Sequence, residues 1–443
     1  MELYRFRSDP KYIIDELQKN YLYFALPNEL NDPMEGFLNI YWEGDVVLWR
    51  NFIKHYLYTL TRSVIRATID PKTIKEPLSI CSEYSNPELR SLFEKIRNNF
   101  FDDKGIKAFV DYLTTLKHRI FIKEIENYLS LIHFVALSVI IDVLKEKQLV
   151  NWSVPKLEVL GFFNKMKFLM PSLEEQYPDA INVFFIASQK VKEDLNLLQK
   201  VNIEDVNDIK SFFLMDFPSK YIKEVRKILF FTPCFVCFME DFSSPSLWGY
   251  YGGKHKGLCL IFDDKKGQNE VKFKFTSGGV ISITTQKIKY QKEYKKINFF
   301  EMMGSLPLSV IEKSWLIDWE GNKTSFLKIG DNFLTDKWRK DYNKNLSEVF
   351  ATKIPDWEKE KEHRIVLQKE FVAGDSVESR KFVYDFELLK GIIFGLNAED
   401  SFKVEVIQII TKKCKELGRK DFKFYQAEYN EETGLIDKIE IRL

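Results

Sequence analysis

Two polar stretches far apart in the chain contain the residue types best suited to chemistry. Asn31-Asp32-Pro33-Met34-Glu35 is the first, and Trp357-Glu358-Lys359-Glu360-Lys361-Glu362-His363-Arg364 is the second. Both contain at least two carboxylates, which the second stretch sets beside Trp357 and Arg364, and burying such groups costs free energy unless they are paired or used. We therefore interpret the two stretches as parts of one polar site.

The second stretch has the periodicity of a strand. Glu360, Glu362 and Arg364 alternate with a period of two, which would place all three side chains on one face. The stretch continues into the apolar run Ile365-Val366-Leu367. A solvated strand edge would also tolerate these charges, but the apolar continuation favours a buried strand that carries a polar cleft.

The first stretch has the residues of a turn. Asn and Asp side chains bond to their own backbone and proline fixes the turn, so Asn31-Asp32-Pro33 taken alone is most often structural. Glu35 adds a carboxylate that could pair with a buried arginine, either Arg5 or Arg364. Arg5 follows Tyr4 in an aromatic segment and needs an anion, which would be a structural partner or a ligand.

A third stretch, residues 246–257, combines aromatic rings, glycines and hydrogen-bond donors. Such a segment can stack a flat ring and present backbone N–H groups to a phosphate. It lacks the Gly-Lys-Ser/Thr of a Walker loop. An aromatic corner with a loose glycine turn explains the composition equally well.

The overall composition is that of a soluble globular protein of two or three domains, since 45% of the 443 residues are hydrophobic and 30% are charged. The 66 Lys and Arg residues balance the 65 Asp and Glu residues. No global field therefore draws the chain to nucleic acid or membrane, although a local basic groove stays possible. The apolar run 129–144 is too short for a membrane span and indicates a buried helix.

The five cysteines are few and odd in number, which favours a cytoplasmic protein. Cys234 and Cys237 form a Cys-x-x-Cys pair within an apolar, strand-like segment. Because no second pair or histidine cluster accompanies them, buried thiols are a better interpretation than a metal or redox site.

The periodicity along the chain predicts an α+β fold. Residues 1–44 have the pattern of strand, helix, strand and loop, residues 45–227 are helical almost throughout, and strands return in residues 228–443. The simplest architecture is a split, mixed or antiparallel β-sheet domain with flanking helices, interrupted by an all-helical insertion. The last predicted elements are a strand at 391–395, a helix at 399–417, and strands at 423–429 and 436–441.

With these motifs in place, the chain resembles the bacterial domain of unknown function 2971. The resemblance covers the two outer segments and omits the helical insertion, which is longer than the corresponding stretch in that family and could add a partner surface or a lid. Its motifs are Leu3-Tyr4-Arg5-Phe6, Asn31-Asp32-Pro33-Met34-Glu35, Leu247-Trp248-Gly249-Tyr250-Tyr251, Thr352-Lys353, the set Trp357, Glu360, Glu362 and Arg364, and Ile392-Ile393-Phe394-Gly395.

The layout of that family is similar to that of ADP-ribosyltransferases, which implies a site for NAD as a substrate. By this resemblance Arg5 would hold the pyrophosphate or ribose, and Tyr251 or Trp248 would stack the nicotinamide. Asn31 and Asp32 would complete the NAD-binding set.

The same resemblance implies catalytic carboxylates. Glu362 would stabilise the oxocarbenium-like ribose that remains when nicotinamide leaves, and Glu360 would orient the acceptor. Arg364 would be a structural partner of Asp32 or Glu35. The central Ser-x-Ser motif of arginine-type transferases is not evident in the sequence.

Three functions are therefore in competition. The first is an NAD-consuming transferase or glycohydrolase that acts on a macromolecular acceptor, as an intracellular toxin or phage-defence effector. The second is a non-catalytic sensor or adaptor that binds a protein or nucleic acid through the helical insertion. The third is a metal-dependent nuclease with Asp32, Glu35, Glu360 and Glu362 as Mg²⁺ ligands. The third ranks lowest because Arg364 would place a positive charge beside the metal, so no metal is expected.

Overall fold

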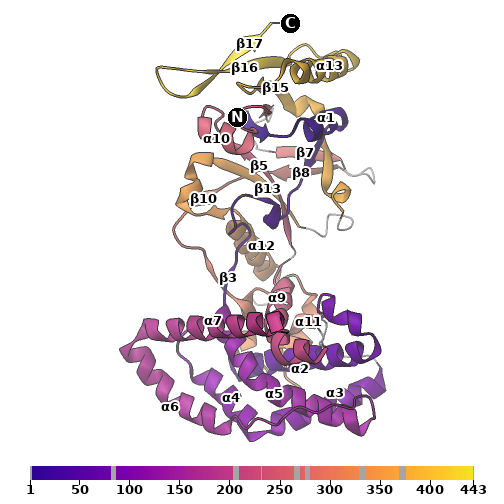
Figure 1. The fold of residues 1–443 in the computed structure, drawn as a ribbon, viewed down its shortest axis with the longest axis vertical. Coiled ribbons are helices and arrows are strands. Elements are labelled where there is room, and N and C mark those ends of the chain that lie inside the picture. Colours follow the sequence, from indigo (N-terminus) through magenta and orange to yellow (C-terminus); the bar gives the residue numbers. More distant parts are fainter. Residues whose placement is uncertain are drawn as a thin grey trace. The chain divides into compact units, whose positions relative to one another are not determined.

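The computed structural model describes residues 2–80, 86–202, 209–230, 232–263, 270–274, 280–328, 335–368 and 376–442. It confirms an α+β fold and divides the chain into two compact units (Figure 1). The first unit comprises Met1–Leu38, Phe231–Lys295 and Asn345–Leu443, and the second comprises Asn39–Phe230 and Lys296–Lys344.

The second unit contains the residues expected as a helical insertion, together with 296–344, which the sequence analysis had assigned to the second part of the α+β domain, 228–443. These additional residues belong there because strand β11 (Lys296–Asn298) pairs in parallel with β3 (Asn39–Trp42). Strand β3 in turn pairs with β4 (Ile120–Phe121). The longer helices are α2 (Val46–Ile69), α3 (Pro87–Asp102), α4 (Lys104–Thr115), α5 (Ile122–Glu146), α6 (Leu160–Gln176), α7 (Pro178–Asn202) and α9 (Phe217–Val225), and the shorter ones include α8 (Ile209–Ser211) and α11 (Leu308–Ile311).

Helix α5 contains the apolar run that the sequence predicted as a buried helix. Among the described residues, α5 is the helix whose length and composition would allow it to cross a membrane. Its most apolar window is 67% buried, as in the core helix of a soluble protein. Leu129, Ile132 and Leu137 are each fully buried, so the helix forms part of the core of the second unit.

The first unit is built on an eight-stranded sheet with the order β17-β16-β15-β6-β1-β5-β13-β9. Its neighbouring strands are antiparallel except for β15 and β16, which are parallel. The strands are β1 (Glu2–Arg7), β5 (Pro233–Met239), β6 (Leu258–Asp263), β9 (Gln286–Lys287), β13 (Glu362–Gln368), β15 (Leu389–Phe394), β16 (Lys423–Tyr429) and β17 (Ile436–Ile441). The bounds of β16 and β17 confirm the predicted strands.

Both faces of the central strands are buried, which is why β5, β6 and β15 are apolar at nearly every position. Helices α1 (Pro10–Lys19) and α13 (Asp400–Glu416) supply Ile13, Leu17 and Val406 to the core on one face. On the other face, Trp248 of α10 (Pro245–Tyr251) packs in a separate cluster with Phe6. Because side chains alternate along β1, this strand contributes residues to two hydrophobic clusters, one on each face of the sheet.

The ladder between β1 and β5 is short. In the described chain it consists of one residue pair, Tyr4 with Met239, whereas β1 pairs with β6 along its whole length. Further along β5, Phe235 instead forms a bridge with Ala25. The strands β1 and β5 therefore part from each other within the sheet, and polar side chains gather where they separate.

Smaller strand pairings position the remaining site residues. A four-stranded sheet has the order β2-β14-β7-β8. Its strands are β2 (Tyr21–Tyr23), β14 (Lys381–Tyr384), β7 (Glu270–Lys274) and β8 (Val280–Thr284). Strand β12 (Thr352–Lys353), which follows α12 (Asp336–Phe350), pairs in parallel with β10 (Lys289–Tyr290).

Candidate functional site

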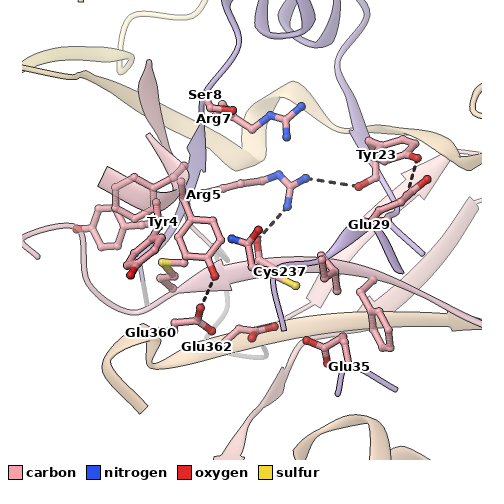
Figure 2. A pocket seen from close by; sticks show the side chains of 18 of the residues that line it. Tyr4, Arg5, Arg7, Ser8, Tyr23, Glu29, Glu35, Cys237, Glu360 and Glu362 are labelled. Carbon is pink, nitrogen blue, oxygen red and sulfur yellow. Dashed lines mark hydrogen bonds between the residues drawn. The ribbon is translucent and has the colours of Figure 1, made fainter. Parts of the chain in front are cut away.

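A cavity of about 360 Å³ lies in the first unit, where β1 and β5 separate (Figure 2). Its volume falls within the range of about 300–1,000 Å³ typical of small-molecule sites. The predicted site residues Arg5, Asn31, Tyr251, Glu360 and Glu362 all line it. The two polar stretches therefore do meet, and β1 and α10 contribute to the same cavity.

Arg5 is a buried cation without a carboxylate partner among the described residues. It is 9% exposed, and its Nη1 and Nη2 atoms donate to the backbone oxygens of Cys237 at 3.0 Å and Tyr23 at 3.4 Å (Figure 2). Its Nε atom is buried with no hydrogen-bond partner. By contrast, the neighbouring Arg7 pairs with Glu16 at 2.7 Å.

Burial disfavours the charge of Arg5. Burial, with a further contribution from Arg7 and against an opposing effect of Glu16, lowers the pKa of Arg5 to about 10. A buried guanidinium in contact with neutral oxygens is costly, so the arrangement is suited to a ligand that brings a negative charge.

Glu362 has most of its hydrogen-bonding capacity filled. Arg364 donates from Nε to Oε1 at 2.8 Å and from Nη2 to Oε2 at 2.9 Å, and Lys353 Nζ lies 2.7 Å from Oε2. A carboxylate has about four acceptor positions, so these three donors leave about one, on Oε1.

The pKa of Glu362 reflects these contacts. Burial alone would raise it, but Arg364 and Lys353 lower it well below its usual range. Glu362 is therefore ionised at neutral pH and paired with two cations. Its predicted role as the carboxylate that contacts the ribose fits this geometry poorly.

Arg364 joins the two polar stretches. Its side chain is completely buried and donates from Nη1 to Glu35 Oε1 at 2.5 Å, and also to the backbone oxygen of Phe350 at 2.9 Å. Of the two partners that the sequence suggested, the structure shows Glu35. Together with Glu362, this arginine holds a buried ion network that links the 31–35 loop to β13.

Lys353 completes the network and was given no role by the sequence pattern. Its Nζ lies 2.7 Å from Glu362, 2.8 Å from Glu360 and 3.5 Å from Glu35. Burial alone would lower its pKa, but Glu362 and Glu35 raise it above its usual value. The amine is therefore a charged ammonium and not a free nucleophile. Lys353 lies on β12, and the pairing of β12 with β10 positions it in the cluster.

Glu360 does not lie on the strand, contrary to the period-two prediction. It ends the 3₁₀ helix Pro355–Glu360, and Lys361 then adopts a left-handed conformation with φ of 43° before β13 starts at Glu362. Its side chain nevertheless reaches the cluster, where it accepts hydrogen bonds from Tyr251 and from Lys353. Burial raises the pKa of Glu360 despite the opposing effect of Lys353.

The structure separates the two aromatic residues that were predicted to stack a ring. Tyr251 lines the cavity. Burial and the neighbouring Glu360 raise the pKa of Tyr251, and Lys353 and Asn31 partly offset this rise. Trp248 does not line it: its ring is fully buried, and its Nε1 donates to the backbone oxygen of Phe242 at 2.8 Å. The stacking role predicted for Trp248 is wrong, because a ring enclosed by core residues has no free face.

Asp32 is also outside the cavity lining. Its Oδ1 accepts the backbone N–H of Met34 at 2.8 Å, and its backbone oxygen accepts that of Glu35 at 3.0 Å. The turn explanation, which the sequence left open, therefore accounts for Asp32. One cavity residue that the sequence analysis passed over is Tyr250, which is 73% exposed.

The cluster does not have the arrangement of a metal site. Within the described ranges, no group of three or more His, Cys, Asp or Glu side chains is placed to hold a metal ion. The ammonium of Lys353 occupies the position between Glu35, Glu360 and Glu362 that a cation bound by them would take. These contacts give a nuclease mechanism based on Mg²⁺ no support.

We expect acid to destabilise this unit. The pKa of Glu29 is lowered to about 2, chiefly by its hydrogen bonds from Arg380, and that of Glu362 is also lowered. Such groups stabilise the folded state above their unfolded pKa of about 4.3, and this stability is lost as the pH falls through the folded value. Because the pKa of Glu360 is raised, its own contribution to the stability of the folded state increases as the pH falls.

The measurement is the urea-unfolding midpoint between about pH 6 and about pH 2. The midpoint should fall with acid, and Glu29→Gln should reduce that slope. Glu358→Gln, at an exposed position of the nearby 3₁₀ helix, should leave the slope unchanged. An unaltered slope in Glu29→Gln would contradict the assignment.

Comparison of the chain with protein-family models, with curated protein sequences and with solved structures gives no match. The resemblance to the domain of unknown function 2971 therefore stays a prediction. What can be argued about function comes from the geometry of the cavity.

Proposed function

We propose that the chain consumes NAD as a substrate, as an ADP-ribosyltransferase-like transferase or a glycohydrolase, in the cavity between β1 and β5. The observation that carries the proposal is that one cavity contains both a buried arginine without a carboxylate partner, Arg5, and a buried carboxylate cluster that includes Glu360. The first suits an anionic group of the ligand, and the second suits positive charge that develops during the reaction.

The anionic group is the pyrophosphate of NAD. A phosphate oxygen would give Arg5 the charged acceptor that it lacks among the described residues, and a hydrogen bond between two charged groups is about twice as strong as a neutral one. Because the Nε atom of Arg5 is unsatisfied and its other donors contact neutral oxygens, the ligand need not displace an ion pair.

The cavity offers two tyrosine rings against which an aromatic ring of NAD can pack. Tyr250 and Tyr251 both line the cavity, with ring centroids 6.5 Å apart. Rings of this kind pack against flat heterocycles such as nicotinamide or adenine. In this proposal Tyr251, and not Trp248, has the stacking role.

The carboxylate cluster supplies electrostatic stabilisation. Cleavage of the nicotinamide–ribose bond leaves an oxocarbenium-like ribose, which fixed negative charge stabilises. Glu35, Glu360 and Glu362 are accompanied by two cations, Lys353 and Arg364, so the ionised cluster retains one net negative charge. The rigid network keeps that charge in place before the ligand binds.

The test is release of nicotinamide from NAD by the purified protein, with and without cell extract as a source of acceptors, and with EDTA in a parallel reaction. We expect release that EDTA does not inhibit. Label transfer from NAD to a macromolecule would indicate a transferase, and free ADP-ribose would indicate a glycohydrolase. No NAD loss and no labelling in any tube would refute the proposal.

An enzyme of this kind would deplete NAD or modify essential molecules in the cell that makes it. This consequence supports the more specific proposal of an intracellular toxin or phage-defence effector.

A binding role for the second unit is the alternative, and it has an observation of its own: α6 and α7 expose many large apolar side chains. They include Phe168, Leu169, Leu173, Val183, Phe184, Ile186, Leu195, Leu197, Leu198 and Val201. Silence in the nicotinamide assay would favour this alternative.

A further inference from the structure

We infer that Glu360 is the general base that removes the proton from a hydroxyl acceptor, with Tyr251 as its positioning residue. This inference rests on the proposed function, and it makes the acceptor a water molecule or an alcohol. It reverses the roles that the resemblance implies, in which Glu362 is catalytic and Glu360 only orients the acceptor.

The first argument is the hydrogen-bonding capacity of the two carboxylates. Three donors engage Glu362, and two of its three contacts come from the guanidinium of Arg364. Glu360 has one donor on each oxygen: Tyr251 on Oε1, and Lys353 on Oε2 at 2.8 Å. With about four acceptor positions on a carboxylate, Glu360 retains two and Glu362 about one. Both glutamates line the cavity, and Glu360, which has no arginine partner, is the freer of the two to accept a proton from a bound molecule.

The second argument is the set of groups that face Glu360. Lys353 of β12, Tyr251 of α10, Glu362 of β13 and Tyr290 of β10 are its titratable neighbours. Burial raises the pKa of Glu360, while Lys353 and Tyr251 lower it. A base is most effective when its pKa is close to the working pH, and a raised carboxyl pKa serves that purpose.

The third argument concerns the acceptor. A neutral hydroxyl, of water or of an alcohol, is a weak nucleophile and needs a base to take its proton. Glu360 lines the cavity and has free acceptor positions, so it can serve as that base. The hydroxyl acceptors are thus the class for which Glu360 is required.

The proposed reaction is a substitution at C1′ of the ribose. The acceptor oxygen bonds to C1′ of the ribose while the C1′–N bond breaks, and the bonding electron pair leaves with nicotinamide, which becomes neutral. The acceptor proton moves to the Glu360 carboxylate and is later released to solvent. Tyr251 keeps its hydrogen bond to Oε1 and holds the carboxylate in position throughout.

The experiment measures kcat and KM for NAD against pH in the full chain, with folding checked by circular dichroism. Glu360→Gln should lower kcat by a factor of about 10²–10⁴ and leave KM for NAD nearly unchanged. Glu358→Gln, in the same 3₁₀ helix but exposed, is the matched control and should behave as wild type.

Tyr251→Phe tests the pH dependence of the rate, which would stay unchanged if Glu360 had only a structural role. The wild-type rate should rise with pH as Glu360 ionises. Since the Tyr251 hydrogen bond lowers the pKa of Glu360, removing the hydroxyl should move this rise to higher pH. Tyr12→Phe, at an exposed position of α1, is the control.

The outcomes separate the two proposals. Nicotinamide release by the wild type with full activity in Glu360→Gln would overturn the inference and leave the proposed function intact. No release by the wild type would overturn both. If Glu360→Gln does not fold, the shift in Tyr251→Phe decides, and an unshifted profile overturns the inference.

Discussion

Replacing Arg364 with methionine is expected to lower the free energy of unfolding by about 3–5 kcal/mol, the cost of breaking a buried ion pair from one side. The side chain is completely buried and bonds to Glu35, Glu362 and the backbone oxygen of Phe350. Without it, Lys353 would be left as the single cation among the buried carboxylates. The loss should appear as a lower midpoint in urea unfolding.

The control for this variant is Arg442→Met, at an exposed position, which should change stability by less than about 0.5 kcal/mol. Adding Glu35→Gln to Arg364→Met should recover part of the lost stability, because it removes one of the uncompensated charges. A loss below about 1 kcal/mol in Arg364→Met would mean that the network does not hold the fold together.

Replacing Arg5 with methionine is expected to do the opposite: to impair ligand binding while folding is retained. The Arg5 guanidinium has no carboxylate partner among the described residues, and burial lowers its pKa to about 10. Exchanging such a group for an apolar side chain is often neutral or stabilising. Its hydrogen bonds to an anionic ligand are worth about 1.5–3 kcal/mol, so affinity for NAD should fall about 10- to 150-fold.

The measurement pairs an NAD titration by calorimetry with the unfolding midpoint of the same preparation. Arg5→Met should have weak binding and a midpoint at or above that of the wild type, and Arg442→Met should match the wild type in both. If Arg5→Met loses as much stability as Arg364→Met, then Arg5 is a structural residue. Two buried arginines of the same unit would thus be distinguished by experiment as binding and structural.

The strands and helices closest to the C-terminus were the most predictable part of the fold. The alternating segments 423–429 and 436–441 form strands with those bounds, and the helix predicted at 399–417 spans Asp400–Glu416. These elements have strong local periodicity and clear turn residues between them. The assignment of 296–344 was not predictable, because it depends on a parallel pairing between β11 and β3 that joins residues more than two hundred positions apart.

The site was predicted in its composition but not in its division of roles. Period-two spacing cannot reveal that Lys361 adopts a left-handed conformation, which removes Glu360 from the strand. In α10, a turn of about 100° per residue places Tyr250 on roughly the opposite side from Trp248, so one ring is 73% exposed and the other is buried. Lys353 was given no role, because no strand or helix spacing links it to Glu360 and Glu362, and its third partner, Glu35, is more than 300 positions away.

The separation of β1 from β5 has a consequence for the synthesis of this protein. The cavity is lined by residues from 4–35, 235–251 and 353–362, so a nascent chain has Arg5 long before it has Glu360 and Glu362. Until residue 362 has been translated, the cavity is incomplete. A polypeptide interrupted before residue 353 would have Glu29 and Glu35 but would lack Lys353, Glu360 and Glu362. Under the proposed activity, a cell would therefore meet a harmful product only once the ribosome has made more than three quarters of the chain.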